Sequence, residues 1–392
     1  MNQIVFLSGA RTPIGSFGGT LKDVPPTALG AHAVKAAISR AGIAPEEVGH
    51  AVFGNVIHTE PRDMYLSRVI AMEAGVPKEA PALTVNRLCG SGLQAIVSAA
   101  QIIRLGDAAI ALAGGAESMS RGGYLLPAAR WGQRMGGAET VDMMLGVLND
   151  PFGHGHMGVT AENVSERYAI SRAQQDEAAV ESHRRAAAAV AGGHFAEQIA
   201  PFEVATRKGT VLFDTDEHFR GDASLDDMAK LRPAFRKGGT VTAGNASGIN
   251  DGAAAVVLAD ADVARARGLR PLARLVSYGF SGVDPSEMGM GPVPAVRIAL
   301  EKAGLRVEDL DIIESNEAFA AQACAVSKAL GLDPAKVNPN GGAIALGHPV
   351  GATGAILAIK AIYELHRTGG RYGLVTLCIG GGQGIAVIVE RC

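Results

Sequence analysis

The 392-residue chain has little of what several protein classes require. Its four cysteines form no Cys-x-x-Cys pair, which argues against a zinc ribbon or a dithiol redox motif. Its 36 basic and 39 acidic residues leave a net charge of −3, so no field of one sign would attract nucleic acid or an anionic membrane. No apolar run reaches the roughly 20 residues that cross a bilayer, and the start lacks a signal-peptide pattern. We therefore expect a cytoplasmic protein.

Glycine, in contrast, is abundant. The chain has 51 glycines in 392 residues, where an average composition of about 7% would give roughly half as many. They gather in short groups between apolar runs, where a backbone turns tightly or approaches another backbone closely.

Apolar runs of strand length alternate with helical patterns along most of the chain. This alternation favours an α/β fold built in layers. The predicted strands cover 4–7, 51–56, 82–85, 109–113, 253–259, 272–278, 311–314, 373–378 and 384–389. The predicted helices cover 27–42, 64–75, 91–105, 172–191, 294–303, 317–330 and 352–367. The middle, from about 119 to 249, has fewer strand-like runs and more charge, and we interpret it as a large insertion laid over the core.

Two stretches form a faint internal repeat. Residues 89–106 align with residues 351–368 at an offset of 262, and both have small residues that lead into a helix. Each helix is followed by a short strand and a glycine cluster. Two similar α/β halves that face each other would bring both glycine-lined helix starts to one central site.

Cys89 is the first candidate for chemistry. It follows a strand and precedes a helix that begins Gly-Ser-Gly. A helix N-terminus carries a partial positive charge, which would lower the thiol pKa and favour a nucleophilic thiolate. The alternative is a buried packing cysteine. The overlapping pattern G-S-G-L-Q-A resembles a dinucleotide-binding turn only weakly, and no P-loop is present.

Three further residues lie in comparable surroundings. His348 lies between Gly347 and Pro349 in a glycine-rich loop that could hold an imidazole as a base for a thiol, or simply a loop histidine. Cys378 ends a strand before three glycines. Asn316 follows the strand D-I-I-E, where an ordinary helix N-cap is the alternative.

At this point the motifs resemble those of the thiolase family, over essentially the whole chain. They are R-T-P-I-G-S-F-G-G, V-N-R-L-C-G-S-G, G-G-A-E-S-M, A-G-N-A-S-G-I-N-D-G-A-A-A, N-E-A-F-A, G-G-A-I-A-L-G-H-P-V-G-A-T-G and C-I-G-G-G-Q-G. N-R-L-C-G-S-G-L-Q-A-I and H-M-G-V-T-A-E-N-V are most similar to the bacterial biosynthetic branch, and within it to β-ketothiolases that supply polyhydroxyalkanoate precursors.

The resemblance implies a five-layered αβαβα fold with three parts. These are an N-terminal core domain, 1–118 completed by about 250–270, a loop domain, 119–249, and a C-terminal core domain, 271–392. It implies no metal and no redox cofactor, and a homotetramer made of two tight dimers. The stretch 121–137 resembles the family's tetramerisation loop, and the only tryptophan, Trp131, would suit such a contact. The alternative is that Trp131 packs on its own loop domain.

The resemblance also implies roles for individual residues. Cys89 would become the acyl-cysteine and His348 would activate it. Cys378 would remove the α-proton of the second acyl-CoA, or protonate the leaving enolate in reverse. Asn316 would hold a water that forms one oxyanion hole with His348, and the backbone N–H groups of Cys89 and Gly380 would form the other.

A second set of residues matches positions that line the family's CoA site. Asp227 stands where the family often has serine, which leaves the contact with the adenine end of CoA in doubt. Met288 and Met290 could border the acyl pocket, with core filling as the alternative. The matched residues are Arg220, Ser247, His156, Met157, Ala243, Phe235, Ala318 and Phe319.

The predicted function is that of a short-chain 3-ketoacyl-CoA thiolase, an acetyl-CoA C-acyltransferase. Its partners would be acyl-CoA and CoA, without nucleic acid or membrane. One alternative is a ketoacyl-acyl-carrier-protein synthase, for which a second catalytic histidine in place of Asn316 would be expected. The other is a non-catalytic acyl-CoA-binding protein, which should have lost one of the reacting groups.

Overall fold

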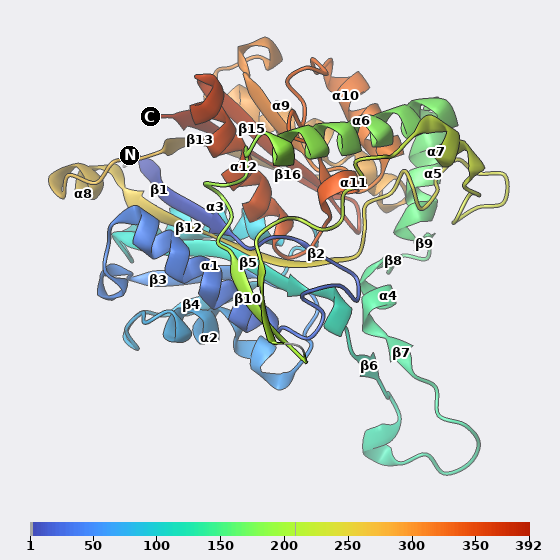
Figure 1. Ribbon diagram of the computed structural model, residues 1–392, viewed down its shortest axis with the longest axis horizontal. Coiled ribbons are helices and arrows are strands. Elements are labelled where there is room, and N and C mark those ends of the chain that lie inside the picture. The colour runs from blue at the N-terminus through green and yellow to red at the C-terminus, as the bar shows by residue number, and fades with distance from the viewer. Residues whose placement is uncertain (1–2, 208) are drawn as a thin grey trace.

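The computed structural model describes residues 3–207 and 209–392. Two sheet halves lie one above the other, with helices between them and outside them, and the two chain ends lie near each other (Figure 1). Backbone pairing joins the halves into one path of strands in the order β14-β15-β16-β13-β1-β12-β5-β3-β4.

The N-terminal half contains β1 (Ile4–Arg11), β3 (His50–Gly54), β4 (Ala82–Val85), β5 (Ile110–Ser118) and β12 (Asn250–Asp260). β3 runs parallel to β4 and β5, whereas β12 is antiparallel to β5 and β1. The short β2 (Gly15–Ser16) pairs with the first residues of β12.

The C-terminal half repeats this topology. It contains β13 (Ala273–Gly282), β14 (Ile312–Ser315), β15 (Tyr372–Ile379) and β16 (Gln383–Arg391). β14 is parallel to β15, and β16 is antiparallel to β15 and β13; a parallel bridge from Ile313 to Val337 stands where β4 stands in the other half. The predicted internal repeat is therefore confirmed.

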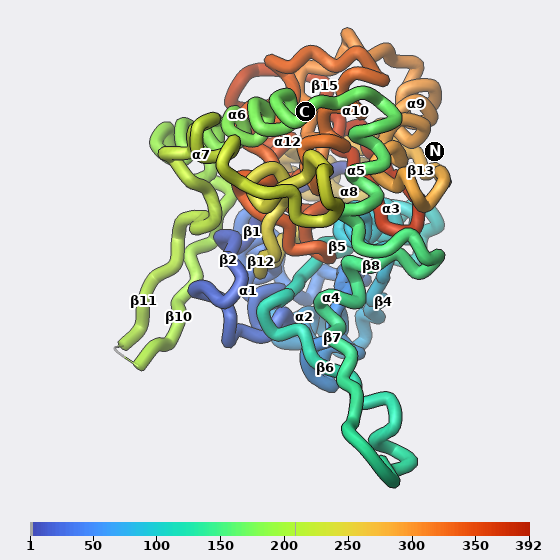
Figure 2. Tube along the Cα trace, turned by 90° about the vertical axis from the view of Figure 1, so that its right-hand side faces the viewer, coloured from blue at the N-terminus to red at the C-terminus, as the bar shows by residue number. Residues whose placement is uncertain are grey.

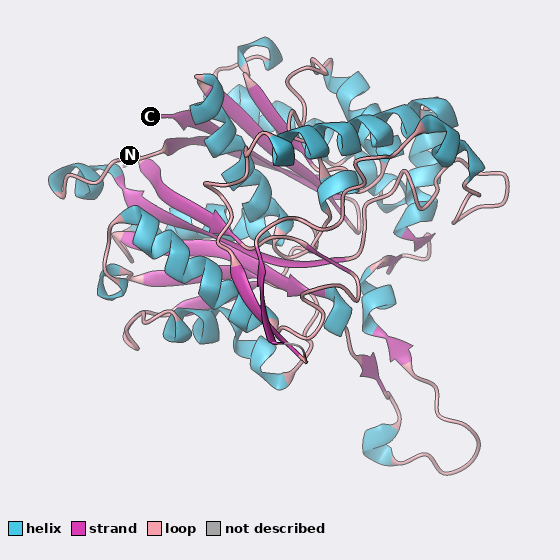
Figure 3. Cartoon of the chain, viewed as in Figure 1, coloured by secondary structure: helices cyan, strands magenta, loops and turns pink. Residues whose placement is uncertain are grey.

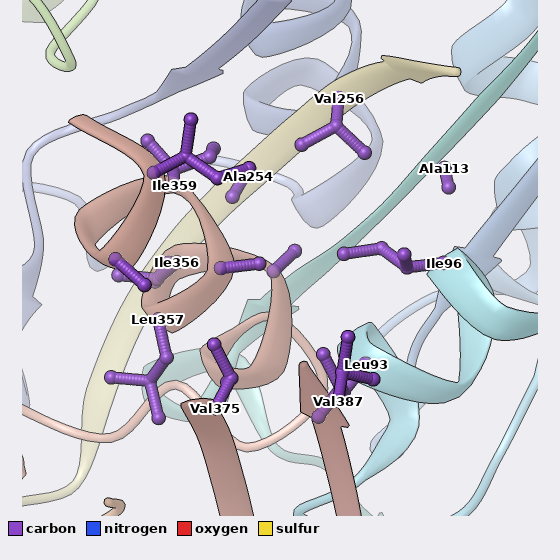
Figure 4. Close-up of a cluster of buried hydrophobic side chains, with 14 of the residues drawn as sticks. Leu93, Ile96, Ala113, Ala254, Val256, Ile356, Leu357, Ile359, Val375 and Val387 are labelled. Atoms are coloured by element: carbon purple, nitrogen blue, oxygen red, sulfur yellow. The ribbon is translucent and has the colours of Figure 1, made fainter. Parts of the chain in front are cut away.

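The helices α3 (Ser91–Leu105) and α12 (Thr353–Thr368) form the central layer between the halves. Figure 4 shows their apolar side chains packed with those of both sheet halves. Their first turns touch at Gly92 and Gly354, where a Cβ on Gly354 would lie 2.3 Å from the backbone nitrogen of Leu93. These glycines, 262 residues apart, explain why both helices begin with small residues.

Outer helices complete five layers (Figure 3). α1 (Pro26–Ala41) and α2 (Leu66–Glu73) cover the N-terminal half. α9 (Pro292–Ala303) covers the C-terminal half, with α10 (Ala320–Leu330) beside it. Alternation in β1 serves both neighbouring layers, because Ile4 and Phe6 face the central helices while Val5 and Leu7 face the outer ones. The predicted five-layered α/β architecture is confirmed.

The segment 88–105 is, in the described part of the chain, the one that is long and apolar enough to cross a membrane. Most of it is α3, and 56% of the segment is buried inside the protein. Its apolar character is explained by its place between two sheet halves.

Between β5 and β12 the chain forms two projecting arms and a group of helices. The β6–β7 arm and the β10–β11 hairpin extend from the body (Figure 2). Trp131, on the first arm, is 84% exposed, so the alternative that it packs on its own loop domain is wrong. The elements are β6 (Tyr124–Leu125), β7 (Val141–Asp142), α4 (Met143–Val147), β8 (Asn149–Asp150), β9 (Gly155–His156), α5 (Met157–Arg167), α6 (Arg172–Ala191), β10 (Phe202–Thr206), β11 (Gly209–Phe213) and α7 (Leu225–Lys230).

The remaining elements are short. They are α8 (Ala261–Ala266), α11 (Ala343–Leu346) and the 3-10 turns Pro45–Glu47, Pro61–Tyr65, Met119–Arg121, Ala129–Trp131, Pro285–Met290 and Val307–Asp309. The helix predicted over 64–75 is thus a 3-10 turn followed by α2, and the one predicted over 317–330 begins only at Ala320.

Candidate active site

A cavity of about 420 Å³ opens between the two halves and the 119–249 region. Cys89, His348 and Gly380 line it, although they are far apart in the sequence. Eight more of the predicted residues share its wall: His156, Met157, Phe235, Ala243, Ser247, Met288, Ala318 and Phe319.

Cys89 is held in a tight turn before α3. Leu88 adopts a left-handed backbone with φ +44°, which a non-glycine residue rarely takes. The Ser91 hydroxyl donates to the Leu88 carbonyl at 2.7 Å and accepts from the Arg87 N–H at 2.8 Å, so it closes the turn. The turn places the partly exposed Cys89 at the cavity wall.

The surroundings of Cys89 act on its pKa in opposite directions. Burial raises the pKa to about 11; the N–H groups of Gly380 and of Cys89 itself donate to the sulfur and lower it, and Glu117 raises it. The prediction that the helix start makes the resting sulfur a thiolate is therefore wrong, because the loss of hydration outweighs these donors. A base has to take the proton.

His348 lines the same cavity and has the properties of such a base. It lies in the loop between α11 and α12, and its Nδ1 is 2.7 Å from the Thr353 hydroxyl. That hydroxyl donates its proton to the Pro349 carbonyl, so it accepts from Nδ1–H and leaves Nε2 unprotonated and able to take a proton. Burial lowers the pKa of His348 to about 4, which keeps the ring neutral at pH 7.

Asn316 is buried one residue after β14, with its Nδ2 3.4 Å from His348 Nε2. The helix N-cap alternative is wrong, because α10 begins at Ala320 after Phe319. The Asn316 Oδ1 atom is buried and has no hydrogen-bond partner in the part of the protein that the structure describes.

Cys378 lies near the end of β15, in an apolar cluster with Met157, Met288 and Phe319. Burial raises its pKa, and the nearby Cys89 raises it further. The second sulfur is therefore a protonated thiol beside the first, which suits a proton donor.

Two buried residues that the sequence analysis did not single out as site residues support the His348 loop. Asn250 accepts the N–H of His348, and Glu117 accepts the N–H of Gly351. Their motifs, I-N-D-G-A and G-G-A-E-S, were the signal in the sequence. Neither residue type by itself indicated a hydrogen bond to a loop from the other half.

The 119–249 region supplies an aromatic wall to the cavity. The rings of His156 and Phe235 stack at 4.7 Å, and Phe235 meets the edge of Phe319 at 6.1 Å. Burial lowers the pKa of His156, whose Nδ1 accepts the Gly158 N–H. The Ser247 N–H donates to the Ala318 carbonyl, which joins this wall to the C-terminal half.

Arg220 lines a second cavity, of about 320 Å³, which shares Ala243 and Ala246 with the first. The Arg220 N–H donates to His183 Nδ1 at 3.1 Å. Asp227 lines the same cavity, but Lys230 at 2.8 Å lowers its pKa and balances its charge. The structure thus places Arg220 next to the first cavity rather than in it.

Of the two methionines predicted at the acyl pocket, Met288 lines the first cavity. Met290 does not, because it packs with Val164, Val293 and Val326 in a separate apolar cluster. For Met290 the alternative of core filling is correct.

No group of three or more His, Cys, Asp or Glu side chains that could hold a metal ion occurs within residues 3–207 and 209–392. The residues that line the two cavities fit an organic thioester better than a metal, since the first is mainly apolar and the second carries Arg220 and two histidines.

Comparisons with known proteins agree with this geometry. The family described as Thiolase, N-terminal domain matches residues 4–262, and Thiolase, C-terminal domain matches 269–391. The chain is 68% identical to Beta-ketothiolase BktB of Cupriavidus necator, over 99% of both chains. It is 50% identical to an acetyl-CoA acetyltransferase of Syntrophomonas wolfei, again over 99% of both.

A solved structure of human mitochondrial 3-ketoacyl-CoA thiolase in complex with CoA has a TM-score of 0.97 at 45% identity, covering 100% of this chain and 98% of that one. These relatives confirm the prediction of an acyltransferase with a thiolase reaction, and they do not support the two alternatives, a carrier-protein synthase and a non-catalytic binding protein. The chain belongs to the thiolase family.

Proposed function

We propose that this thiolase acts on short 3-ketoacyl-CoA substrates by a ping-pong mechanism through an acyl thioester on Cys89. The observation that carries the proposal is that Cys89, His348 and Gly380 line one cavity, with Cys378 beside Cys89. A nucleophile, a neutral base, a protonated thiol and oxyanion donors are the groups that this carbon–carbon bond cleavage needs.

In the thiolysis direction, His348 Nε2 takes the proton of Cys89, and the sulfur attacks the 3-keto carbon. The N–H groups that face the sulfur, those of Gly380 and Cys89, stabilise the resulting oxyanion. The C2–C3 bond then breaks, the acyl group stays on Cys89, and the leaving enolate of acetyl-CoA takes a proton from Cys378.

In the second half-reaction the Cys378 thiolate takes the proton of a CoA thiol, and the CoA sulfur attacks the acyl-Cys89 thioester. The same N–H groups stabilise the second tetrahedral oxyanion. Its collapse releases acyl-CoA, and the protonated His348 returns its proton to the Cys89 sulfur. The Asn316 amide, next to His348 Nε2, supports the other oxyanion site, where the enolate oxygen would lie. The reverse sequence is Claisen condensation.

CoA would extend from the first cavity into the second. The aromatic wall of His156 and Phe235 suits the pantetheine arm, and Arg220 suits the adenosine or a phosphate. Lys230 balances the Asp227 charge, which reduces its repulsion of a polyanion. We propose that the reaction uses no metal or redox cofactor, since CoA thioester, thiol and imidazole account for every bond and proton.

We further propose a cytoplasmic homotetramer that does not bind nucleic acid or membrane. The β6–β7 arm supports the assembly, because it presents Trp131, Met135 and Leu126 to solvent far from its own body. The strand β4 supports a dimer, because it ends the sheet with Leu83 45% exposed.

The test is CoA-dependent thiolysis of acetoacetyl-CoA beside 3-ketopentanoyl-CoA, with no added metal or nicotinamide. We expect turnover of both. Turnover of acetoacetyl-CoA alone would limit the pocket to the acetyl unit, and turnover of neither would overturn the proposal.

Cys89→Ala should lower turnover by at least about 10⁴-fold and abolish the acyl-enzyme mass adduct, because no acceptor for the acyl group remains. Cys324→Ala is the matched control, because this thiol lies in α10 outside the cavity. Equal adduct formation in Cys89→Ala and native protein would show that another group carries the acyl unit.

A further inference from the structure

The catalytic base is not held in place by its own half of the protein alone. The loop 348–351 belongs to the C-terminal half, yet two of its N–H groups are bonded by side chains from the N-terminal half. The Asn250 Oδ1 atom accepts from the His348 N–H at 2.9 Å. The Glu117 Oε2 atom accepts from the Gly351 N–H at 2.8 Å.

These two side chains come from paired strands. Asn250 is the first residue of β12 and Glu117 is near the end of β5, and the register places Gly252 opposite Glu117. Both side chains are fully buried. The adjacent ends of two paired strands therefore present two acceptors to two N–H groups three residues apart in one loop.

The loop is shaped to receive both side chains. Gly347, with φ +109°, lies so close to Asn250 that a Cβ there would be 2.5 Å from its Cγ. Gly351 lies equally close to Glu117, where a Cβ would be 2.5 Å from Oε2. The two glycines flank the H-P-V segment, and each leaves room for one of the two acceptors. A larger residue at either position would displace the acceptor that the hydrogen bond requires.

Both side chains are themselves anchored. The Asn250 Nδ2 atom donates to the Gly15 carbonyl at 3.1 Å, and because both partners are backbone groups of fixed polarity, the amide orientation is settled. Glu117 also accepts from the N–H groups of Val56 and Ile57 and from Asn55 Nδ2. Neither side chain can move without breaking bonds on its own side.

We propose that Asn250 and Glu117 are positioning residues that clamp the 348–351 loop across the two halves and so hold the His348 imidazole at Cys89. The Nδ1–Thr353 bond orients the ring within the loop, whereas the clamp places the loop itself. This inference rests on the proposed function, in which His348 deprotonates Cys89.

The test is the rate at which iodoacetamide alkylates Cys89 at pH 7, followed by peptide mass spectrometry, together with kcat and KM for CoA. Asn250→Leu removes both hydrogen bonds at similar volume. The Glu117 carboxylate accepts from four N–H groups, two on each oxygen. In Glu117→Gln one oxygen becomes an NH₂ group, which would face two of these N–H groups and cannot accept from them. We expect both variants to slow alkylation and kcat at least about tenfold while KM for CoA stays within about twofold.

Asn250→Asp separates the two bonds of Asn250, because it keeps an acceptor for the His348 N–H and loses the donor to Gly15. Its Cys89 should be alkylated faster than that of Asn250→Leu. If the leucine variant does not fold, Asn250→Asp and Glu117→Gln together test the proposal. Gln175→Leu is the matched control, since Gln175 is a buried amide bonded to Ser165 and Thr240 away from the site. It should lower the melting temperature without slowing alkylation.

His348→Asn distinguishes the possible failures. If it does not slow Cys89 alkylation, the proposed base–nucleophile pair is wrong. If it slows alkylation while folded Asn250 and Glu117 variants keep native rates, or raise only KM for CoA, the clamp is wrong and the pair stands.

Discussion

The two halves of this thiolase share a topology and differ in chemistry. Each has a helix in the central layer that begins at a glycine-rich turn, and the two turns touch at Gly92 and Gly354. In the proposed mechanism the N-terminal half contributes the acyl carrier, Cys89. The C-terminal half contributes the groups that would move protons, His348 and Cys378. The backbone repeat is thus symmetric, whereas the side chains proposed for the reaction differ between the two halves.

The offset of 262 makes this asymmetry explicit. It places Gly351 at the position that corresponds to Cys89, since 89 plus 262 is 351. Where one half has a thiol, the other has a glycine whose N–H is bonded by Glu117. In the proposed mechanism one helix start presents the nucleophile, and its counterpart belongs to the loop that carries the base.

Removing the base should produce the largest effect within this comparison. His348→Asn keeps a polar side chain but has no nitrogen with a free lone pair, and we expect kcat to fall about 10³-fold, within the range for general-base loss. The rate of single-turnover acylation with acetoacetyl-CoA measures the loss in the step that His348 would assist. A fall of less than tenfold would mean that another group deprotonates Cys89, and the division of labour between the halves would not hold.

The buried ion pairs offer a comparison of stability. Among the described residues two ion pairs are fully buried: Arg11 of the N-terminal half with Asp216 of the 119–249 region, and Lys360 with Glu314 within the C-terminal half. Lys360→Met leaves Glu314 without its partner, and we expect the free energy of unfolding to fall by about 3–5 kcal/mol.

The double variant Lys360→Met with Glu314→Gln should recover much of that loss, because no uncompensated charge remains. Urea unfolding of the three proteins decides this. Equal stability of the single and double variants would show that the loss comes from packing rather than from the unpaired carboxylate.

Most of the fold could be predicted from the sequence, and the reason is periodicity. All nine predicted strands exist, because buried strands are short apolar runs, and α3 and α6 have the predicted bounds because capping and glycine signals mark their ends. The arms and α5 were missed, since neither has a long apolar pattern. Local patterns singled out Cys89, His348, Cys378 and Asn316 as candidates, and the resemblance assigned their roles.

The geometry around those residues could not be read in the same way. The helix start just after Cys89 indicates a low thiol pKa, but the sequence does not show how much water the fold removes from the sulfur. Asn316 looked like an N-cap because strand and helix are close in sequence, whereas three residues separate Asn316 from Ala320. The bonds of Asn250 and Glu117 to the 348–351 loop join residues about 100 and 234 positions apart, beyond any local pattern.

The stability contributed by the 119–249 region should depend on pH through His183. Burial lowers the pKa of His183 to about 4, and its Nδ1 accepts the Arg220 N–H. A pKa below the unfolded value of about 6.5 means that its contribution is complete above pH 6.5 and is lost as pH falls towards 4.

Between pH 7 and pH 5 the unfolding free energy of native protein should fall by about 1–2 kcal/mol more than that of His183→Asn. The asparagine can still accept the Arg220 N–H but does not titrate. Urea midpoints at the two pH values measure this difference. Parallel pH dependence in native and variant would assign the effect to other groups, among them His348, whose pKa is lowered in the same direction.

Two neighbouring methionines test how far the C-terminal half also shapes substrate choice. Met288 and Met290 are both buried in one 3-10 turn, but only Met288 lines the cavity. Met288→Ala widens the pocket and should raise the preference for 3-ketopentanoyl-CoA over acetoacetyl-CoA by roughly tenfold, at the low end of what one methylene contributes, about 1–3 kcal/mol. Met290→Ala creates a similar void away from the cavity and should leave the kcat/KM ratio unchanged. An equal shift in both variants would mean that a looser turn, and not a wider cavity, alters the acyl preference. The C-terminal half would then contribute to proton transfer but not to the choice of acyl length.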